Sequence, residues 1–171
     1  MNPPVPDVPH SDRDTWLEAV LEAHGPALGR LAASYARDLG EREDLVQEIV
    51  VAIWKALPRF RGECSERTFV FRIAHNRGIA HLARRRVPTA SAADELEVQS
   101  PGPNPEQALS KAQQGDRLLE AVHRLPLGYR QVVTLTLEGF GYAEIADVLG
   151  ITESNVGARL TRARQMLRQL L

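Results

Sequence analysis

The sequence predicts an all-α protein in which two small helical domains are joined by a flexible linker. Apolar residues recur every three or four positions in each apolar segment, which is the spacing of one helix face. No segment alternates apolar and polar residues as a half-buried strand does. Gly150 and Thr152 predict a tight corner between two helices, because glycine tolerates the positive φ of a helix end and threonine caps the next helix.

Two long helices are predicted in the first part of the chain. Residues 14–38 carry an apolar stripe, and Gly25-Pro26 predicts either a kink or a break into two helices, because proline lacks a backbone donor. Residues 42–57 carry a wide apolar face, which indicates a helix packed against a core. Pro58 ends this second helix.

A loop, a third helix and a linker are predicted next. Residues 59–63 have the composition of a loop, and Ser65 or Thr68 then begins a helix that continues to about Arg86. Residues 87–110 contain four prolines and few large apolar side chains. This composition predicts a linker with little capacity to pack.

The second half predicts four further helices. Residues 111–124 and 128–138 form two of them, and a helix over residues 142–149 is followed by another that begins near Thr152. The last two form a helix-turn-helix whose inward positions are Ile145, Ala146, Leu149, Val156, Leu160 and Ala163. The predicted plan is a disordered tail over residues 1–11, domains over residues 12–86 and 111–171, and the linker over residues 87–110.

Charge is divided along the chain. The formal net charge is −1, which excludes a uniformly basic protein that coats DNA. Residues 12–48 hold nine acidic and four basic side chains, whereas residues 59–86 hold eight arginines and two glutamates. Such segregation is expected of a protein that meets both another protein and a phosphate backbone.

Several classes of protein are disfavoured by what the sequence lacks. No apolar run reaches the roughly 18–20 residues that span a bilayer, and the N-terminus has no apolar signal core. Cys64 is the single cysteine, which excludes an intrachain disulfide and fits a reducing cytoplasm. Cys64, His75 and His81 lack the i, i+4 spacing of two metal ligands on one helix face, so we expect no metal and no cofactor.

The helix-turn-helix predicts a DNA-binding surface, because this motif carries its second helix into the major groove. The alternative is an ordinary helical hairpin with solvated arginines. The small, glycine and apolar positions fall where the two-helix corner needs them, which favours the DNA-binding interpretation. The outward candidates for DNA contact are Ser154, Asn155, Ala158, Arg159 and Arg162.

Two segments together resemble a known family. The segment EREDLVQEIVVAIWKALPRFRGECSERTFVFRIAHNRGIAHLARRR resembles conserved region 2 of the extracytoplasmic-function (ECF) sigma factors of bacterial RNA polymerase. The segment LPLGYRQVVTLTLEGFGYAEIADVLGITESNVGARLTRAR resembles their region 4. The order of the segments, the linker between them and the overall length also fit the family. The resemblance implies two helical domains that bind polymerase and promoter DNA.

The DLVQE segment predicts a protein-binding face. Asp44, Gln47 and Glu48 stand at i, i+3 and i+4, so they share one face of the second helix. The resemblance implies that this face docks on the clamp coiled coil of the largest polymerase subunit, with the two carboxylates paired to basic groups there. A solvated acidic helix face is the alternative.

The resemblance also implies that the third helix and the loop before it read the minus-ten promoter element. Arginines there can neutralise phosphates, and interleaved phenylalanines can stack on bases. Asn76 is implied to line a pocket for a flipped base. For Phe71 the alternative is core packing, and for Phe69, a position that is usually tryptophan in the family, core packing is the favoured interpretation. The predicted DNA-binding residues of this half are Arg59, Phe60, Arg61, Arg72, Asn76, Arg77, Arg84 and Arg85, with Arg67 and Arg86 as further cations.

Gly157 departs from the family pattern, which usually has lysine or arginine at this position of the minus-thirty-five reading helix. Glycine inside a helix costs about 1 kcal/mol relative to alanine. The favoured interpretation is drift in a helix that needs little affinity of its own, and the alternative is a close backbone approach to DNA or to a partner. A helix that lacks this contact is expected to bind DNA weakly alone.

The resemblance implies a cytoplasmic, non-enzymatic initiation factor that binds core RNA polymerase and promoter DNA, helps open the strands, and is controlled by an anti-sigma factor. Two other classes remain as alternatives. A stand-alone regulator would need a dimer interface or an effector pocket, and neither is evident. A small helical enzyme would need a nucleophile–base pair or paired carboxylates, and none stands out.

Overall fold

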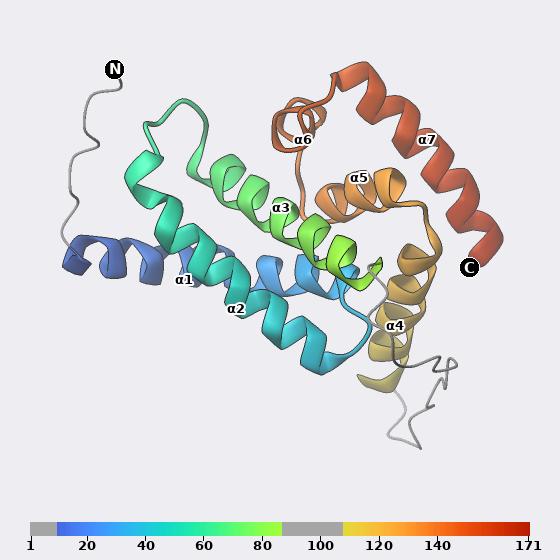
Figure 1. The fold of residues 1–171 in the computed structure, drawn as a ribbon. Helices are drawn as coiled ribbons and strands as arrows, with labels where there is room; N and C mark the ends of the chain where they lie inside the picture. Colours follow the sequence, from blue (N-terminus) through green and yellow to red (C-terminus); the bar gives the residue numbers. More distant parts are fainter. Residues whose placement is uncertain (1–9, 87–107) are drawn as a thin grey trace.

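The computed structural model describes residues 10–86 and 108–171, which are helical throughout apart from short connections. No strand occurs in these two ranges, so the predicted all-α class is confirmed. Figure 1 shows α1, α2 and α3 in one group and α4 to α7 in a second group beside it. The elements are α1 (His10–Tyr35), α2 (Leu39–Ala56), the 3₁₀ turn η1 (Leu57–Arg59), α3 (Glu66–Arg86), α4 (Ala108–Arg124), α5 (Leu127–Leu137), α6 (Tyr142–Leu149) and α7 (Glu153–Leu170).

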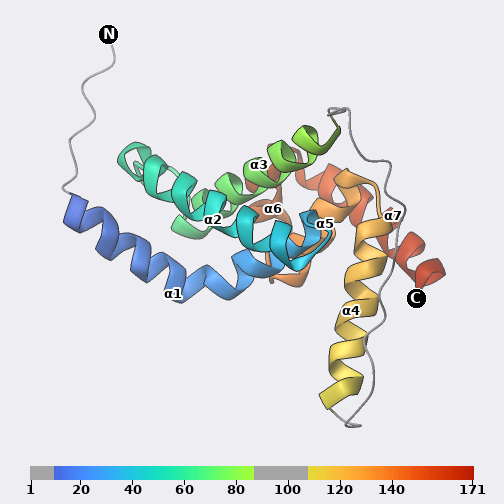
Figure 2. The same ribbon diagram turned by 60° about the horizontal axis from the view of Figure 1, so that its bottom comes forward.

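The first helix is continuous, so of the two alternatives predicted at Gly25-Pro26, a kink or a break, the break does not occur. Pro26 lies inside α1, and Figure 2 shows that the axis of this helix changes direction along its length, as in a kinked helix. Packing overrides the local cost of proline, because Val20, Leu28 and Leu31 on the same helix are fully buried. The helix begins within the predicted tail, most of which lies outside the described residues.

The three helices of the first half surround one apolar core. Leu45, Ile49 and Ile53 of α2 face α1 and α3 and have no exposed surface. The start of α2 is capped by Asp38, whose carboxylate accepts a hydrogen bond from the Glu41 amide at 2.8 Å. The start of α3 is capped as predicted, with the Ser65 hydroxyl accepting from the Thr68 amide at 3.1 Å. Asp38 and Ser65 are therefore local signals that fix where α2 and α3 begin.

The second half is a helical domain that ends in the predicted helix-turn-helix. Gly150 has a φ of 65°, the left-handed conformation that glycine adopts without steric cost. The Thr152 hydroxyl accepts from the Asn155 amide at 3.2 Å and begins α7. Of the six positions predicted to face inward in the helix-turn-helix, five are buried. Leu149 is only half-buried, and its neighbour Val148 is buried instead. The buried five are Ile145, Ala146, Val156, Leu160 and Ala163.

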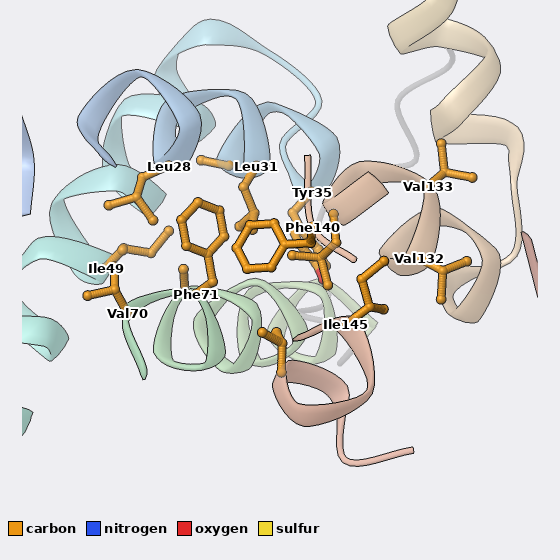
Figure 3. Packing of buried hydrophobic residues seen from close by; sticks show 14 of the residues in the cluster. Leu28, Leu31, Tyr35, Ile49, Val70, Phe71, Val132, Val133, Phe140 and Ile145 are labelled. Carbon is orange, nitrogen blue, oxygen red and sulfur yellow. The ribbon is translucent and has the colours of Figure 1, made fainter. Parts of the chain in front are cut away.

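The two halves pack against each other. Phe140, which precedes α6, is 4% exposed, and its ring lies 4.7 Å from the ring of Phe71 on α3. Figure 3 shows these two rings together with apolar side chains of both halves. The sequence left open whether the halves associate, and the structure answers that they do. Most of the predicted linker, residues 87–107, lies outside the described residues.

Candidate nucleic-acid and protein interface

The predicted acidic face on α2 borders a shallow groove between α2 and α3. Asp44 and Gln47 are exposed, and Glu48 is partly buried. Apolar surface accompanies the charge, because Val51 lies one turn further along α2 and is 49% exposed. The groove is lined by Asp44, Gln47, Glu48, Val51, Ala52, Lys55, Arg77 and Arg84. This mixture of carboxylates and apolar surface suits docking of a basic, partly apolar partner.

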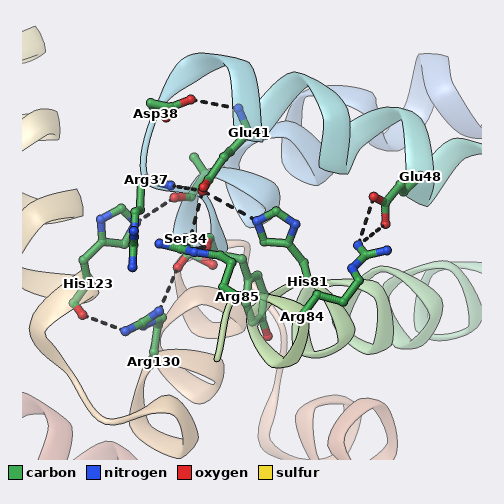
Figure 4. Close-up of polar contacts among 12 residues, drawn as sticks. Ser34, Arg37, Asp38, Glu41, Glu48, His81, Arg84, Arg85, His123 and Arg130 are labelled. Carbon is green, nitrogen blue, oxygen red and sulfur yellow. Dashed lines mark hydrogen bonds and ion pairs between the residues drawn. The ribbon is translucent and has the colours of Figure 1, made fainter. Parts of the chain in front are cut away.

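The groove brings together residues that the sequence assigned to different partners. Arg84 of α3, predicted to contact DNA, donates from Nη2 to both carboxylate oxygens of Glu48, at 2.9 and 2.7 Å. Figure 4 shows this pair bridging α2 and α3. Both side chains are partly exposed, so the pair is readily exchanged for other charges.

The loop before α3 presents two exposed arginines and an aromatic stack. Arg59 and Arg61 are exposed, whereas Phe60 is half-buried with its ring 4.6 Å from that of Phe69. Phe69 is itself partly buried against the core. Phe60 is therefore supported by a neighbouring ring and not fully buried, as a base-stacking side chain needs.

The middle of α3 divides into buried and exposed positions. Asn76 and Arg77 are exposed, whereas Phe71 is buried and belongs to the core. Arg72, predicted to contact DNA, donates from Nη2 to the backbone oxygen of Asp147 on α6 at 2.9 Å. One predicted minus-ten contact is thus engaged by the helix-turn-helix.

The end of α3 is held against the first two helices. Arg85 contacts the Glu41 carboxylate at 3.5 Å and donates to the backbone oxygen of Tyr35 at 3.3 Å. His81 lies 3.6 Å from the same Glu41 carboxylate, as Figure 4 shows. Arg85 was predicted to contact DNA, and in this structure its guanidinium instead ties α3 to α1 and α2.

A buried polar pair supports the α3 surface from behind. The Tyr35 hydroxyl and His75 Nδ1 lie 2.5 Å apart, and both side chains are almost fully buried. Burial lowers the pKa of His75 to about 3, so the ring is neutral, and burial also raises the pKa of the Tyr35 hydroxyl. The hydroxyl and the neutral ring share one hydrogen bond, whose donor is set by the ring tautomer. The bond fixes the register of α1 and α3 beneath Asn76, the next residue in the chain.

The candidate reading helix α7 is open to solvent along its outward face. Ser154, Asn155, Ala158 and Arg162 are exposed, as predicted. Arg159 is half-buried because its guanidinium lies over Gly128, where an added Cβ would come within 3.1 Å of Nη1. Four of the five predicted contacts are therefore available without rearrangement of a side chain.

Gly157 does not mark a close backbone contact within this chain. A Cβ at this position would meet the Tyr142 ring at 3.5 Å, which is an ordinary van der Waals distance. The half-buried site would therefore accept alanine. Within the chain no crowding requires glycine here.

The remaining sequence candidates form no site among the described residues. In residues 10–86 and 108–171, no group of three or more histidine, cysteine or acidic side chains is placed to hold a metal ion. Cys64 is a partly buried free thiol in the loop before α3. None of the described helices combines the length and apolar character needed to cross a bilayer.

Sequence reasoning missed the contacts that join the two halves. Arg30 of α1 pairs with Glu138 at 2.7 Å, and Arg67 of α3 lies over the Phe140 ring at 3.7 Å. Residues 139–141, Gly-Phe-Gly, have the composition of a simple turn between two helices. A large aromatic residue between two glycines in an otherwise polar corner was a signal for an intramolecular contact, although it does not identify the partner.

The chain matches two family descriptions, one in each half. Residues 20–96 match "Sigma-70 region 2", and residues 115–167 match "Sigma-70, region 4". The first range contains the α2 and α3 surfaces, and the second contains the helix-turn-helix. The order of the two regions agrees with the resemblance noted from the sequence.

Two curated proteins and one solved structure are similar over most of their length. RNA polymerase sigma factor NccH of Alcaligenes xylosoxydans is 30% identical over 158 residues, covering 89% of this chain and 84% of that protein. RNA polymerase sigma factor CnrH of Cupriavidus metallidurans is 33% identical over 161 residues, with the same shares. A structure of CnrH in complex with the cytosolic domain of CnrY superposes with a TM-score of 0.70 at 26% identity, covering 94% of this chain and 90% of that one. The likeness therefore extends over both halves.

Proposed function

The chain belongs to the ECF sigma factors of bacterial RNA polymerase, and on this premise we propose that it is a transcription initiation factor. It binds core RNA polymerase, recognises the minus-ten and minus-thirty-five promoter elements, and promotes strand opening. The observation that carries the proposal is the presence of both matched regions in one chain, each with its own exposed polar surface.

The α2 face is proposed to dock on the polymerase clamp. Asp44 and Gln47 are exposed on it, and Glu48 can exchange Arg84 for a basic group of the polymerase. Val51 adds apolar surface beside the carboxylates. The two carboxylates would orient a basic partner, and the apolar surface beside them would be removed from water on contact. This combination favours a specific protein contact.

The loop before α3 and the middle of α3 are proposed to read the minus-ten element. Arg59, Arg61 and Arg77 are exposed cations for phosphates, and Phe60 offers a ring edge for stacking. The exposed Asn76 amide can both donate to and accept from an unpaired base. Strand opening here is binding work, because holding an extruded base stabilises the separated strands.

The outward face of α7 is proposed to read the minus-thirty-five element. Ser154, Asn155 and Ala158 lie on the first two turns of the helix, where a helix-turn-helix contacts base edges. Arg159 and Arg162 are proposed for phosphates or guanines. Without a side chain at Gly157, this surface has few contacts and is expected to need polymerase to hold it on DNA.

Control by an anti-sigma factor in the cytoplasm is proposed from the relatives. CnrH was solved in complex with the cytosolic domain of CnrY, and both halves of this chain are similar to it. A protein that covers the α2 face would compete with the polymerase clamp. No chemical reaction is assigned to the chain, since sigma factors act by binding.

Reconstitution with core RNA polymerase tests the proposal. The chain is expected to co-elute with core polymerase and to direct initiation on promoters that contain both elements. Free chain that binds a promoter tightly and specifically, but never co-elutes with polymerase, would instead support a stand-alone regulator.

A further inference from the structure

The outward face of the second half of α3 combines one carboxamide with three apolar side chains. The four positions stand at i, i+3, i+4 and i+7 and therefore share one face of the helix: Asn76, Ile79, Ala80 and Ala83. All four are exposed, and Ile79 is 40% exposed. Alanine has no side-chain atom beyond Cβ, so Ile79 is the largest apolar group on this face.

The core uses the opposite face of α3. Val70, Phe71 and Ala74 are at most 1% exposed. Gly78 lies against the Tyr35 ring, where an added Cβ would come within 2.6 Å of a ring carbon. This close packing fixes the rotation of α3 about its own axis. The face that carries Asn76 and Ile79 is therefore held outward by the fold.

Exposed guanidinium groups border the apolar face. Arg72 precedes Asn76 by four positions, and Arg77 and Arg84 stand at the other edge of the face. A single exposed isoleucine is ordinary on a protein surface. An apolar strip between cations suits a nucleic acid, because phosphates can meet the edges while base edges meet the middle. The charge around Ile79 thus favours DNA over an apolar protein partner.

Thymine is the base whose edge suits an isoleucine. It carries a C5 methyl group, which apolar side chains contact, whereas the other bases present mainly hydrogen-bonding groups there. Ile79 and Ala80 lie about one helical turn from Asn76, roughly 5 Å along the axis. Successive base pairs are about 3.4 Å apart. A base one or two steps from the one that contacts Asn76 is therefore within reach of Ile79.

We propose that Ile79, with Ala80 and Ala83 beside it, is a specificity-determining residue that selects a thymine next to the base held by Asn76, through the 5-methyl group of that thymine. The inference rests on the proposed function, because it requires α3 to read the minus-ten element. Contact removes the methyl group from water. Cytosine at the same place would turn its amino group toward apolar surface and leave a donor unsatisfied.

Replacement of thymine by deoxyuridine tests the contact, because it removes one methyl group and keeps the base pair. Transcription of a promoter library by core polymerase with the natural chain first identifies the preferred template. Each thymine of the minus-ten element and of the base pairs that border it is then replaced singly, on either strand. The measured quantity is the ratio of initiation on the thymine template to initiation on the deoxyuridine template. Changes in overall activity cancel in this ratio.

We expect the natural chain to lose roughly three- to fourfold in initiation at one such thymine, the factor that corresponds to one buried apolar carbon. Ile79→Ala should bring the ratio at that position to about one, and Ile79→Val should give an intermediate ratio. Leu39→Ala is the matched control and should keep the natural ratio, because Leu39 is 66% exposed at the start of α2, outside the surfaces proposed to bind polymerase or DNA.

Two results would overturn the assignment. In the first, no thymine in or beside the minus-ten element is sensitive to loss of its methyl group, which would leave the apolar face to a protein partner. In the second, the sensitive position is equally sensitive in Ile79→Ala. Failure of the proposed function is a different result, in which the natural chain with core polymerase initiates on no template or initiates equally well after the minus-ten element is scrambled.

Discussion

The two surfaces proposed to read DNA differ in how many of their side chains already have partners within the chain. In the first half, Arg72 is bonded to Asp147, Arg84 to Glu48, and Arg85 to Tyr35. In the second half, most of the outward face of α7 is open. The difference teaches that part of the proposed minus-ten surface is already engaged within the chain, whereas the proposed minus-thirty-five surface is largely free.

The supports beneath the two surfaces also differ. The α3 surface is backed by the buried Tyr35–His75 pair and by Gly78, where an added Cβ would lie 2.6 Å from the Tyr35 ring. The α7 surface is backed by Val156, Leu160 and Ala163. The aliphatic core beneath α7 tolerates small changes in side-chain volume. The support beneath α3 is more sensitive, because it depends on the protonation state of His75 and on the small volume of Gly78.

Charge reversal on α2 should have the largest effect, because it places like charges across the proposed docking surface. Asp44→Lys/Glu48→Lys is expected to weaken binding to core polymerase by at least about 3 kcal/mol, roughly a hundredfold. Glu18→Lys/Glu22→Lys is the matched control, since these two glutamates are exposed at the same i, i+4 spacing on α1. Equal losses in both variants would show that net charge, and not the α2 face, governs binding.

Gly78→Ala should be the next largest change and should act on stability alone. Its Cβ would enter the Tyr35 ring, so we expect the free energy of unfolding to fall by about 2–3 kcal/mol. Chemical denaturation followed by circular dichroism measures it. An unchanged free energy of unfolding would mean that α1 and α3 can move apart easily, which would contradict the close packing described beneath Asn76.

Acid should destabilise the first half through His75. Its pKa in the folded chain, about 3, lies below the unfolded value of 6.5, so the unfolded chain binds more protons between these values. Stability is therefore full above pH 6.5 and falls as the pH drops toward 3, by about 2 kcal/mol at pH 5. Thermal melts across this range measure the slope, and His75→Gln should flatten it. A slope unchanged in His75→Gln would assign the effect to other groups.

Gly157→Ala should have the smallest effect, with the opposite sign to Gly78→Ala. The added methyl meets the Tyr142 ring at an ordinary distance, and alanine gains up to about 1 kcal/mol over glycine in a helix. Denaturation midpoints of the two variants, measured side by side, make the comparison direct. A loss of stability at position 157 would mean that the backbone there is closer to its neighbours than 3.5 Å implies.

The sequence predicted what depends on neighbouring residues. Gly150 and Thr152 set the helix-turn-helix corner through backbone conformation and a single side-chain bond, so its helices could be bounded from the sequence. Pro26 left a kink and a break open, because the choice between them depends on the tertiary packing of α1.

The contacts between the halves could not be predicted, because the partners are distant in sequence. Arg30 and Glu138 are 108 positions apart, and neither has a distinctive neighbourhood. The same reason explains why the sequence identified the arginines of α3 as cations but not which of them already have partners. The partners of Arg72 and Arg85 are decided by how the helices pack against each other, and the periodicity of apolar residues does not predict that packing.

Transcription by reconstituted polymerase on a promoter library most directly tests the claim that the two halves read one promoter together. Templates would vary the minus-ten element, the minus-thirty-five element and the spacing between them. We predict that initiation requires core polymerase, both elements and a narrow range of spacings, and that free chain alone selects no template. Equal initiation when either element is scrambled, or tight selection of templates by the free chain, would contradict it.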